Sequence, residues 1–187
     1  MARTSRRSTA QAQTQPGYGN LLGLFVIVAL TLGLFFYIFT SLTSNDWRWF
    51  DRSLDVQPQR IVVIDRGQRT ELDPSDPMFA PLAAAFNQSI SQGYRHADLG
   101  FSRPTWELVE REGLLVETSY VQPVRLHING GFQPTNQLLL LVSGDKLHTT
   151  QVLFRRNRDD WDPIPLIVNS VEPLKGELEH LGFGAAR

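Results

Sequence analysis

Apolar residues fall into two patterns along the chain: one continuous run near the N-terminus and shorter periodic runs beyond it. The continuous run extends from Leu21 to Leu42 and contains no charged side chain. As a helix its 22 residues would be about 33 Å long, enough for the roughly 30 Å of a bilayer's hydrocarbon core. A buried helix of a soluble protein is rarely apolar on every face over this length. Residues 21–42 are therefore predicted to form one transmembrane helix.

The end of this run distinguishes an anchor from a cleaved signal peptide. A signal peptide has an apolar core of about 7–15 residues, which is followed by small residues at a cleavage site. Here the run is longer and closes with the residues Tyr37 to Leu42 (YIFTSL), which offer no such site. The sequence favours an uncleaved signal anchor.

The charges on either side of the anchor predict its orientation. Three arginines and no acidic residue precede it (Arg3, Arg6 and Arg7), whereas acidic residues offset the arginines that follow it. The positive-inside rule then places the N-terminus in the cytoplasm and the rest of the chain outside it.

Two further features of the anchor predict contacts. Trp47, Trp49 and Phe50 follow the helix, where amphipathic rings favour the outer headgroup level. Ala29 and Gly33 are small residues four positions apart, which would let two such helices approach closely as a weak homodimer.

The chain on either side of the anchor divides into four segments. Residues 1–20 are polar and aperiodic and are predicted to be a disordered cytoplasmic tail. Residues 43–59 are expected to form a juxtamembrane tether. Residues 60–183 have the length of one domain, and residues 184–187 form a short C-terminal tail.

Within the domain, the spacing of apolar residues predicts strands and helices. Two short runs form a hairpin, and two helices follow, the first with Asp76 as its N-cap and Pro77 at its first position. Pro81 is discordant with a regular first turn of that helix. The predicted elements are a hairpin at 60–65 and 69–72, a helix at 77–92, a helix from Ser102 or Pro104 to Glu112, strands at 114–121, 123–128, 137–143 and 149–156, an extended segment at 163–168 and a helix at 173–181.

Glycines and prolines set the expected ends of these elements. Gly93, Gly113 and Gly182 are predicted to end the three helices, and Phe183, just beyond the last of them, is expected to pack on the domain. Pro163 and Pro165 lack amides on the same side of the extended segment. That segment is therefore either a protected sheet edge or irregular.

The order of these elements predicts an α+β fold, in which the helices pack on one face of an antiparallel β-meander. Helices that precede an antiparallel meander also resemble, in order alone, the small NTF2-like domains of some secretion-apparatus components with one membrane span. This resemblance is one of architecture, and no motif transfers residues from that family.

Charge and composition exclude several functions. Without the three N-terminal arginines, 15 of the 18 basic residues remain against 19 acidic ones, so the downstream part has a net charge near −4. Such a domain lacks the positive electrostatic potential that attracts the phosphate backbone of nucleic acids, so nucleic acid is not expected as a partner. The absence of cysteine excludes disulfides, thiolate nucleophiles and cysteine metal sites.

The search for catalytic residues finds no motif. The chain has no nucleophile elbow, phosphate-binding loop, dinucleotide fingerprint or HExxH motif. Its four histidines lie on different predicted elements without ligand spacing: His96, His127, His148 and His180. No catalytic, cofactor-binding or metal residue is therefore predicted. An enzyme site would have to be assembled from dispersed residues such as Asp65, Asp98 and His127.

Two local patterns have an ordinary structural interpretation. The densest group of acids has calcium-like spacing but lacks the EF-hand pattern, and arginines adjoin it. We expect a self-neutralising hairpin turn there, with Trp161 packed on the domain, rather than a calcium or lipid-headgroup site. The residues concerned are Asp159, Asp160 and Asp162 with Arg155, Arg156 and Arg158. Asn87-Gln88-Ser89 is a formal glycosylation acceptor in the middle of a predicted helix.

Together these patterns favour a non-catalytic interaction or accessory module that acts in a membrane or envelope assembly. The tether could span roughly 55 Å when fully extended, although its aromatic residues favour a domain held near the bilayer. The alternatives are a membrane-tethered enzyme with a site assembled from dispersed residues, and a ligand-sensing domain whose output would need a partner.

Overall fold

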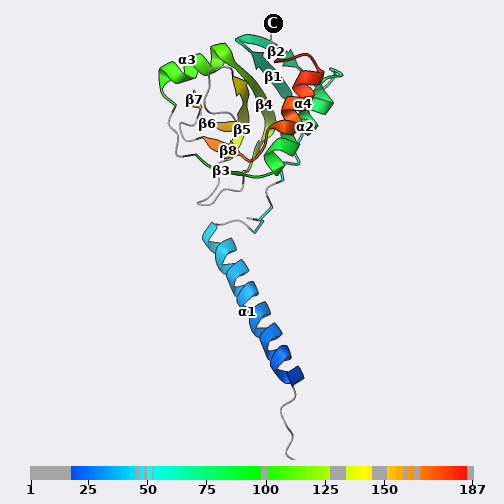
Figure 1. Ribbon diagram of the computed structural model, residues 1–187, viewed down its shortest axis with the longest axis vertical. Helices are drawn as coiled ribbons and strands as arrows, with labels where there is room; N and C mark the ends of the chain where they lie inside the picture. The colour runs from blue at the N-terminus through cyan, green and yellow to red at the C-terminus, as the bar shows by residue number, and fades with distance from the viewer. Residues whose placement is uncertain are drawn as a thin grey trace, which may run out of the picture.

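The computed structural model describes residues 18–44, 47–48, 50–51, 53–97, 101–126, 134–144, 151–157, 160–161 and 165–184. A long helix, α1 (Tyr18–Ser44), projects from an α+β domain (Figure 1). The elements of the domain are β1 (Arg60–Asp65), β2 (Gln68–Leu72), α2 (Phe79–Ser91), β3 (Tyr94–His96), α3 (Arg103–Glu112), β4 (Gly113–Val124), β5 (Thr135–Gly144), β6 (Val152–Asn157), β7 (Asp160–Trp161), β8 (Leu166–Val168) and α4 (Glu172–His180).

The domain is built on one antiparallel sheet with the strand order β2-β1-β4-β5-β6-β8-β3, which confirms the α+β class. β4, β5 and β6 are neighbours in both sequence and space and form the predicted meander. The β1–β2 hairpin extends it on one side, and β8 and β3 extend it on the other. β7 pairs with the end of β6 in a separate hairpin.

Helices cover both faces of this sheet, so the prediction that they pack on one face is wrong. Side chains along a strand point alternately to opposite faces. Val63 and the paired Val116 belong to the core cluster that includes α2 and α4, on what we call the first face. Ile64 and the paired Leu115 pack with Val109 of α3 on the second face. Figure 1 shows the sheet between α3 on one side and α2 and α4 on the other.

α2 begins two residues later than predicted. Its N-cap is Met78 rather than Asp76, because the preceding segment forms turns of its own. There Asp73 accepts hydrogen bonds from the amide and the hydroxyl of Ser75, and these bonds lower the pKa of Asp73. Pro81 becomes the third helical residue, where a backbone amide has no partner within the helix. It therefore costs the helix no hydrogen bond.

The three glycines end their helices for two different reasons. Gly93 and Gly182 have φ values of 101° and 86°, the left-handed conformation expected after a helix. Gly113 follows α3 as predicted, but its φ of −87° is available to any residue. A Cβ on Gly113 would lie 2.4 Å from the carbonyl oxygen of Val109. Gly113 is thus required by the close approach of α3 to β4.

Two predicted strands, 114–121 and 123–128, are replaced by one long strand, β4. Its pairing with β5 shifts between Ser119 and Val124, and Pro123 lies in this irregular stretch. A proline is tolerated at such a bulge, because no ladder hydrogen bond is needed from it. Residues 127–128 lie outside the described part of the chain.

The segment with two prolines is not a sheet edge. β8 pairs with β6 on one side and with β3 on the other. Pro165 stands just before this paired stretch, and its carbonyl oxygen accepts a hydrogen bond of 3.1 Å from the amide of Ala97. Pro163 lies outside the described residues. The strand that forms the edge is β3, which the sequence did not predict.

Other predictions are confirmed. Arg66 and Gly67 both have positive φ, as the tight turn of the β1–β2 hairpin requires. α3 begins at Arg103, between the two predicted starting points Ser102 and Pro104, and the Ser102 hydroxyl caps it by accepting a hydrogen bond from the Thr105 amide. Phe183, beyond the closing helix α4, packs against the core of the first face.

Candidate functional site

Six polar side chains line the half of the second face that α3 leaves open. Along β4, Leu115 lies under α3, and the next residues on the same face are Glu117 and Ser119. The strand registers place polar residues of the neighbouring strands beside them. We call this set the polar strip: Arg60, Arg69, Glu71, Glu117, Ser119 and Gln137.

Two ion pairs organise the polar strip. Arg69 Nη2 lies 3.1 Å from Glu117 Oε2, and the Glu117 side chain is only 7% exposed. Arg60 Nη1 lies 3.2 Å from Glu71 Oε1, and both of these side chains are exposed. The first pair neutralises a buried carboxylate, whereas the second lies in water and is worth little.

One open groove, with a volume of about 430 Å³, lies over the end of the polar strip. Gln59, Arg60, Ser119 and Gln137 are among its lining residues. Gln137 donates weakly to the Ser119 hydroxyl at 3.5 Å, while its buried Oε1 atom accepts no hydrogen bond from a described residue. A buried acceptor without a donor is costly, so this oxygen would gain from any donor that reached it.

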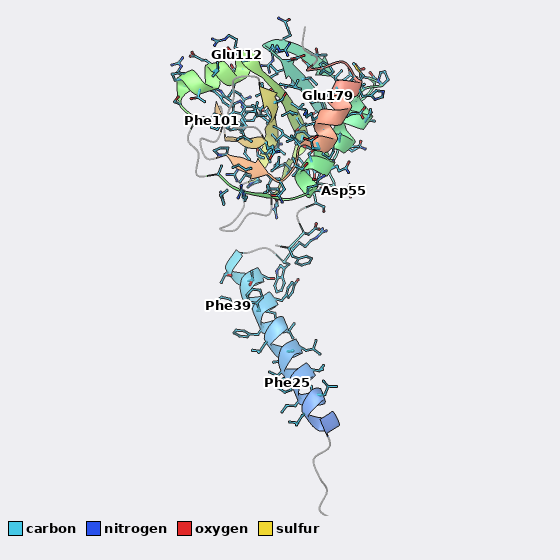
Figure 2. All side chains as sticks on the ribbon, viewed as in Figure 1. Phe25, Phe39, Asp55, Phe101, Glu112 and Glu179 are labelled. Carbon is cyan, nitrogen blue, oxygen red and sulfur yellow. The ribbon has the colours of Figure 1, made fainter. Side chains whose placement is uncertain are left out.

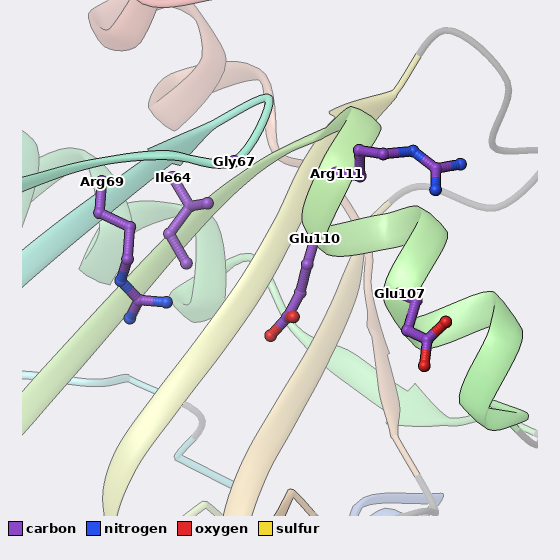
Figure 3. A pocket seen from close by; sticks show the side chains of 6 residues that line it. All are labelled: Ile64, Gly67, Arg69, Glu107, Glu110 and Arg111. Atoms are coloured by element: carbon purple, nitrogen blue, oxygen red, sulfur yellow. The ribbon is translucent and has the colours of Figure 1, made fainter.

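A second groove, of about 320 Å³, separates α3 from the β1–β2 hairpin. Gly67 and Arg69 line one side of it, and Glu107, Glu110 and Arg111 line the other. Figure 3 shows the Glu110 carboxylate directed towards the side where Arg69 lies, whereas the Arg111 guanidinium points away. Its charges of both signs favour neither an anion nor a cation.

The dispersed residues of the enzyme alternative are not brought together among the described residues. Asp65, at the end of β1, accepts a hydrogen bond of 3.0 Å from the amide of Gly184. This contact joins the C-terminal segment to the sheet, which is a structural role. Asp98 and His127 lie outside the described residues.

The histidines and the acidic cluster form no metal site within the described ranges, where no group of three or more potential ligands is close enough. His96 is exposed on β3, and His180 is exposed at the end of α4. His148, Asp159, Asp162 and Arg158 lie outside the described residues. The predicted hairpin there is confirmed by the pairing of β6 with β7, and the Arg156 guanidinium lies 5.7 Å from the ring centre of Trp161. Arg155 is buried on β6, where a headgroup could not reach it.

The side chains of the formal glycosylation acceptor, Asn87-Gln88-Ser89, are partly engaged in contacts within the domain. Ser89 is fully buried, and the Asn87 amide donates a hydrogen bond of 3.1 Å to the carbonyl oxygen of Val56. Two residues earlier, Leu54 is buried in the first-face core, and its amide donates to the Ser91 hydroxyl at 3.1 Å. The last part of the predicted tether therefore packs along α2.

α1 is compatible with a membrane span. Residues Leu21–Thr43 have a mean hydropathy of 2.6 in their most apolar window, and none of that window is buried. Figure 2 shows its side chains, among them Phe25 and Phe39, standing away from the rest of the protein.

The chain matches no protein-family model, no curated protein and no solved structure. The resemblance in element order to NTF2-like domains therefore stays a prediction.

Proposed function

We propose that this protein is a non-catalytic module of a membrane or envelope assembly. In this proposal α1 is an uncleaved anchor with its N-terminus in the cytoplasm, and the domain lies outside and docks onto a neighbouring membrane protein through the polar strip. The anchor is supported by the length and exposure of the apolar helix. The orientation is supported by the arginines that precede the helix.

The observation that carries the docking proposal is the buried Oε1 atom of Gln137, which accepts no hydrogen bond from a described residue, in a side chain that lines the groove. A donor from a partner would satisfy it, and Ser119 and Asn136 beside it offer further polar groups. Around this groove the ion pairs keep the strip close to neutral, so a neutral polar segment fits better than a strongly charged one.

The enzyme and ligand-sensing alternatives are not favoured by a specific observation. Asp65 is held by the C-terminal segment, and both grooves are open rather than enclosed. An enclosed apolar pocket with converging polar groups is the usual feature of a small-molecule site.

Site-specific photo-crosslinking in native membranes tests the docking proposal. A photoreactive residue at Gln59, which is exposed and lines the groove, should crosslink to a membrane protein. The control position is Glu179 on α4, which is also exposed but lies over the first face. The substitution Gln137→Met, which keeps the volume and removes the amide, should reduce the crosslink at position 59 severalfold.

A crosslink at both positions, or one that is unchanged by Gln137→Met, would show that the polar strip is not the docking surface. A chain that yields no crosslink at either position and behaves as a lone monomer would overturn the assembly role itself.

A further inference from the structure

The chain folds back on α1 directly after the helix ends. The Tyr37 hydroxyl donates a hydrogen bond of 2.8 Å to the carbonyl oxygen of Trp47. The Tyr37 ring lies 6.2 Å from the ring of Trp47 and 6.3 Å from that of Phe50, centre to centre. Since α1 continues to Ser44, residues 47 and 50 lie beside its last turns rather than beyond its end.

This outer end is the only covered part of the helix among residues 21–43. Ser41 is 1% exposed, and Tyr37 and Thr40 are half-buried, whereas every other side chain in that range is exposed. Positions 37, 40 and 41 share one face of a helix. The covered face is thus the one that receives Trp47 and Phe50.

The hydrogen bond from the Tyr37 hydroxyl to the Trp47 carbonyl oxygen satisfies a physical requirement if α1 crosses a bilayer. A hydrocarbon core of about 30 Å that begins at Leu21 ends near residue 40, so Tyr37 lies roughly 4–5 Å inside it. A hydroxyl at that depth has no water to bond and needs an acceptor. The Trp47 carbonyl supplies one, and the bond holds the Trp47 backbone close to the boundary.

A hydrogen-bonded turn fixes the conformation of the segment that folds back on α1. The Asp51 amide donates to the carbonyl oxygen of Arg48 at 2.8 Å, and the Arg48 guanidinium contacts the Asp51 carboxylate. Asp51 also accepts hydrogen bonds from the hydroxyl and the amide of Ser53, which lower its pKa to about 2. Of the polar residues in this turn, Arg48 lies between the two aromatic residues along the chain, and Asp51 and Ser53 follow them.

We propose that Tyr37, Trp47 and Phe50 form an interfacial clamp, in which the Trp47 and Phe50 rings insert into the acyl–headgroup boundary of the outer leaflet. The partner of this surface is lipid. Trp47 and Phe50 are exposed in the protein, at 56% and 62%, and their rings lie beside Tyr37 of α1. Aromatic rings of this kind concentrate at membrane interfaces.

The clamp shortens the link between membrane and domain. Leu54 is already part of the domain core, so only four steps separate it from Phe50. That distance is at most about 14 Å, in place of the roughly 55 Å of an extended tether. The domain would therefore stay close to the bilayer, with Leu54 no farther from its boundary than about two lipid headgroup layers.

The cysteine-free chain allows a direct test with single-cysteine variants of the full protein in phosphatidylcholine nanodiscs. Phe50→Cys carries an apolar fluorophore, which is quenched by nitroxide lipids of two depths and by aqueous iodide. We expect quenching by the shallow lipid nitroxide and weak quenching by iodide. Reference labels are placed at Leu30→Cys, in the middle of α1, and at Gln88→Cys, which is exposed on α2.

A variant that lacks the Tyr37 hydroxyl distinguishes the clamp from the general tendency of apolar side chains to enter the membrane. Tyr37→Phe in the Phe50→Cys background should raise iodide quenching about twofold or more, since the hydrogen bond to Trp47 is lost. Thr31→Val is the matched control, because the Thr31 hydroxyl bonds only within the helix, to the Ile27 carbonyl oxygen. It should leave iodide quenching unchanged.

The proposal rests on the membrane anchor but not on docking to a partner, and its outcomes separate the two. Iodide quenching at position 50 as strong as at Gln88, with Leu30 still quenched only by lipid, would overturn the clamp and leave the anchor. Iodide quenching at Leu30 would overturn both. A failed crosslink at Gln59 would overturn only the docking proposal.

Discussion

Ser89 on α2 supplies the cap that α4 lacks: its hydroxyl oxygen accepts a hydrogen bond of 3.3 Å from the amide of Leu174, 85 residues later. The N-cap position of α4, Val171, makes no side-chain cap of its own. Leu174 is the third residue of α4, whose amide has no partner within the helix. Two helices that cover the first face are thus joined by a buried hydrogen bond as well as by apolar contacts.

Ser89→Ala is therefore expected to lower the free energy of unfolding by about 1–2 kcal/mol, because it leaves a buried amide without an acceptor. Urea unfolding of the full chain in detergent, followed by tryptophan fluorescence, measures the change. Gln88→Ala, at the exposed neighbouring position, is the control and should change the midpoint little. Equal effects of the two substitutions would contradict a capping role.

Substitution of glycine by alanine should have opposite effects on stability at Gly113 and Gly176. Gly113→Ala places a Cβ 2.4 Å from the Val109 carbonyl oxygen and should destabilise the domain by about 2–3 kcal/mol. Gly176→Ala lies within α4 with no atom within 4 Å of the new Cβ, and should stabilise by about 0.5–1 kcal/mol. The melting temperatures of the two variants should move in opposite directions, and a shared direction would refute the steric account.

The two ion pairs of the polar strip should differ in their contribution to stability. Arg69→Ala leaves the Glu117 carboxylate buried without its cation, which should cost about 1–2 kcal/mol. Arg60→Ala removes an exposed pair and should cost no more than about 0.5 kcal/mol. Chemical denaturation at low and high salt distinguishes them, because salt weakens the exposed pair more than the partly buried one. If Arg60→Ala cost more, the burial of Glu117 would not be the deciding factor.

Tyr120 should make stability depend on alkaline pH. Burial raises the pKa of Tyr120 to about 12, and the hydrogen bond from the Thr118 hydroxyl only partly offsets this. The folded pKa is above the ordinary value of 10.0, so the unfolded chain loses this proton first as pH rises. The contribution is fully present below pH 10 and is lost between pH 10 and about 12.

The expected loss is about 2–3 kcal/mol over that range. Unfolding free energies at pH 8 to 11 should fall more steeply for the natural chain than for Tyr120→Phe, which has no phenol to ionise. An identical slope in the two proteins would assign the alkaline dependence to other groups.

Local patterns in the sequence were sufficient for the elements that local contacts define. The β1–β2 hairpin needs only its strands and the Arg66-Gly67 turn, and α3 needs only its apolar stripe and the Ser102 cap. α2 was displaced by two residues because the Asp73 turn competes for the same segment.

Elements that depend on distant partners were missed or misplaced. β3 has three residues and no periodic pattern, and it exists through pairing with β8, about 70 residues later. That pairing also makes β8 an interior strand. The polar strip was missed for the same reason: Arg69 and Glu117 are 48 residues apart, and only the registers of β1 with β2 and β4 bring them together. The alternation of Leu115, Glu117 and Ser119 was the available signal. The sequence alone does not give the register in which the strands pair, and so does not show which residues lie beside them.

The two edge strands determine how the domain behaves among copies of itself. Anchored proteins share a plane, where neighbours collide often and an open strand edge invites a second sheet to join. Here one edge, β3, is only three residues long and carries Arg95 and His96, and the other, β2, carries Arg69 and Glu71. Short, charged edges of this kind resist such joining. If α1 anchors the protein as proposed, its copies can be crowded at the membrane without polymerising through the sheet, and the proposed partner has more to gain from the face of the sheet than from its edges.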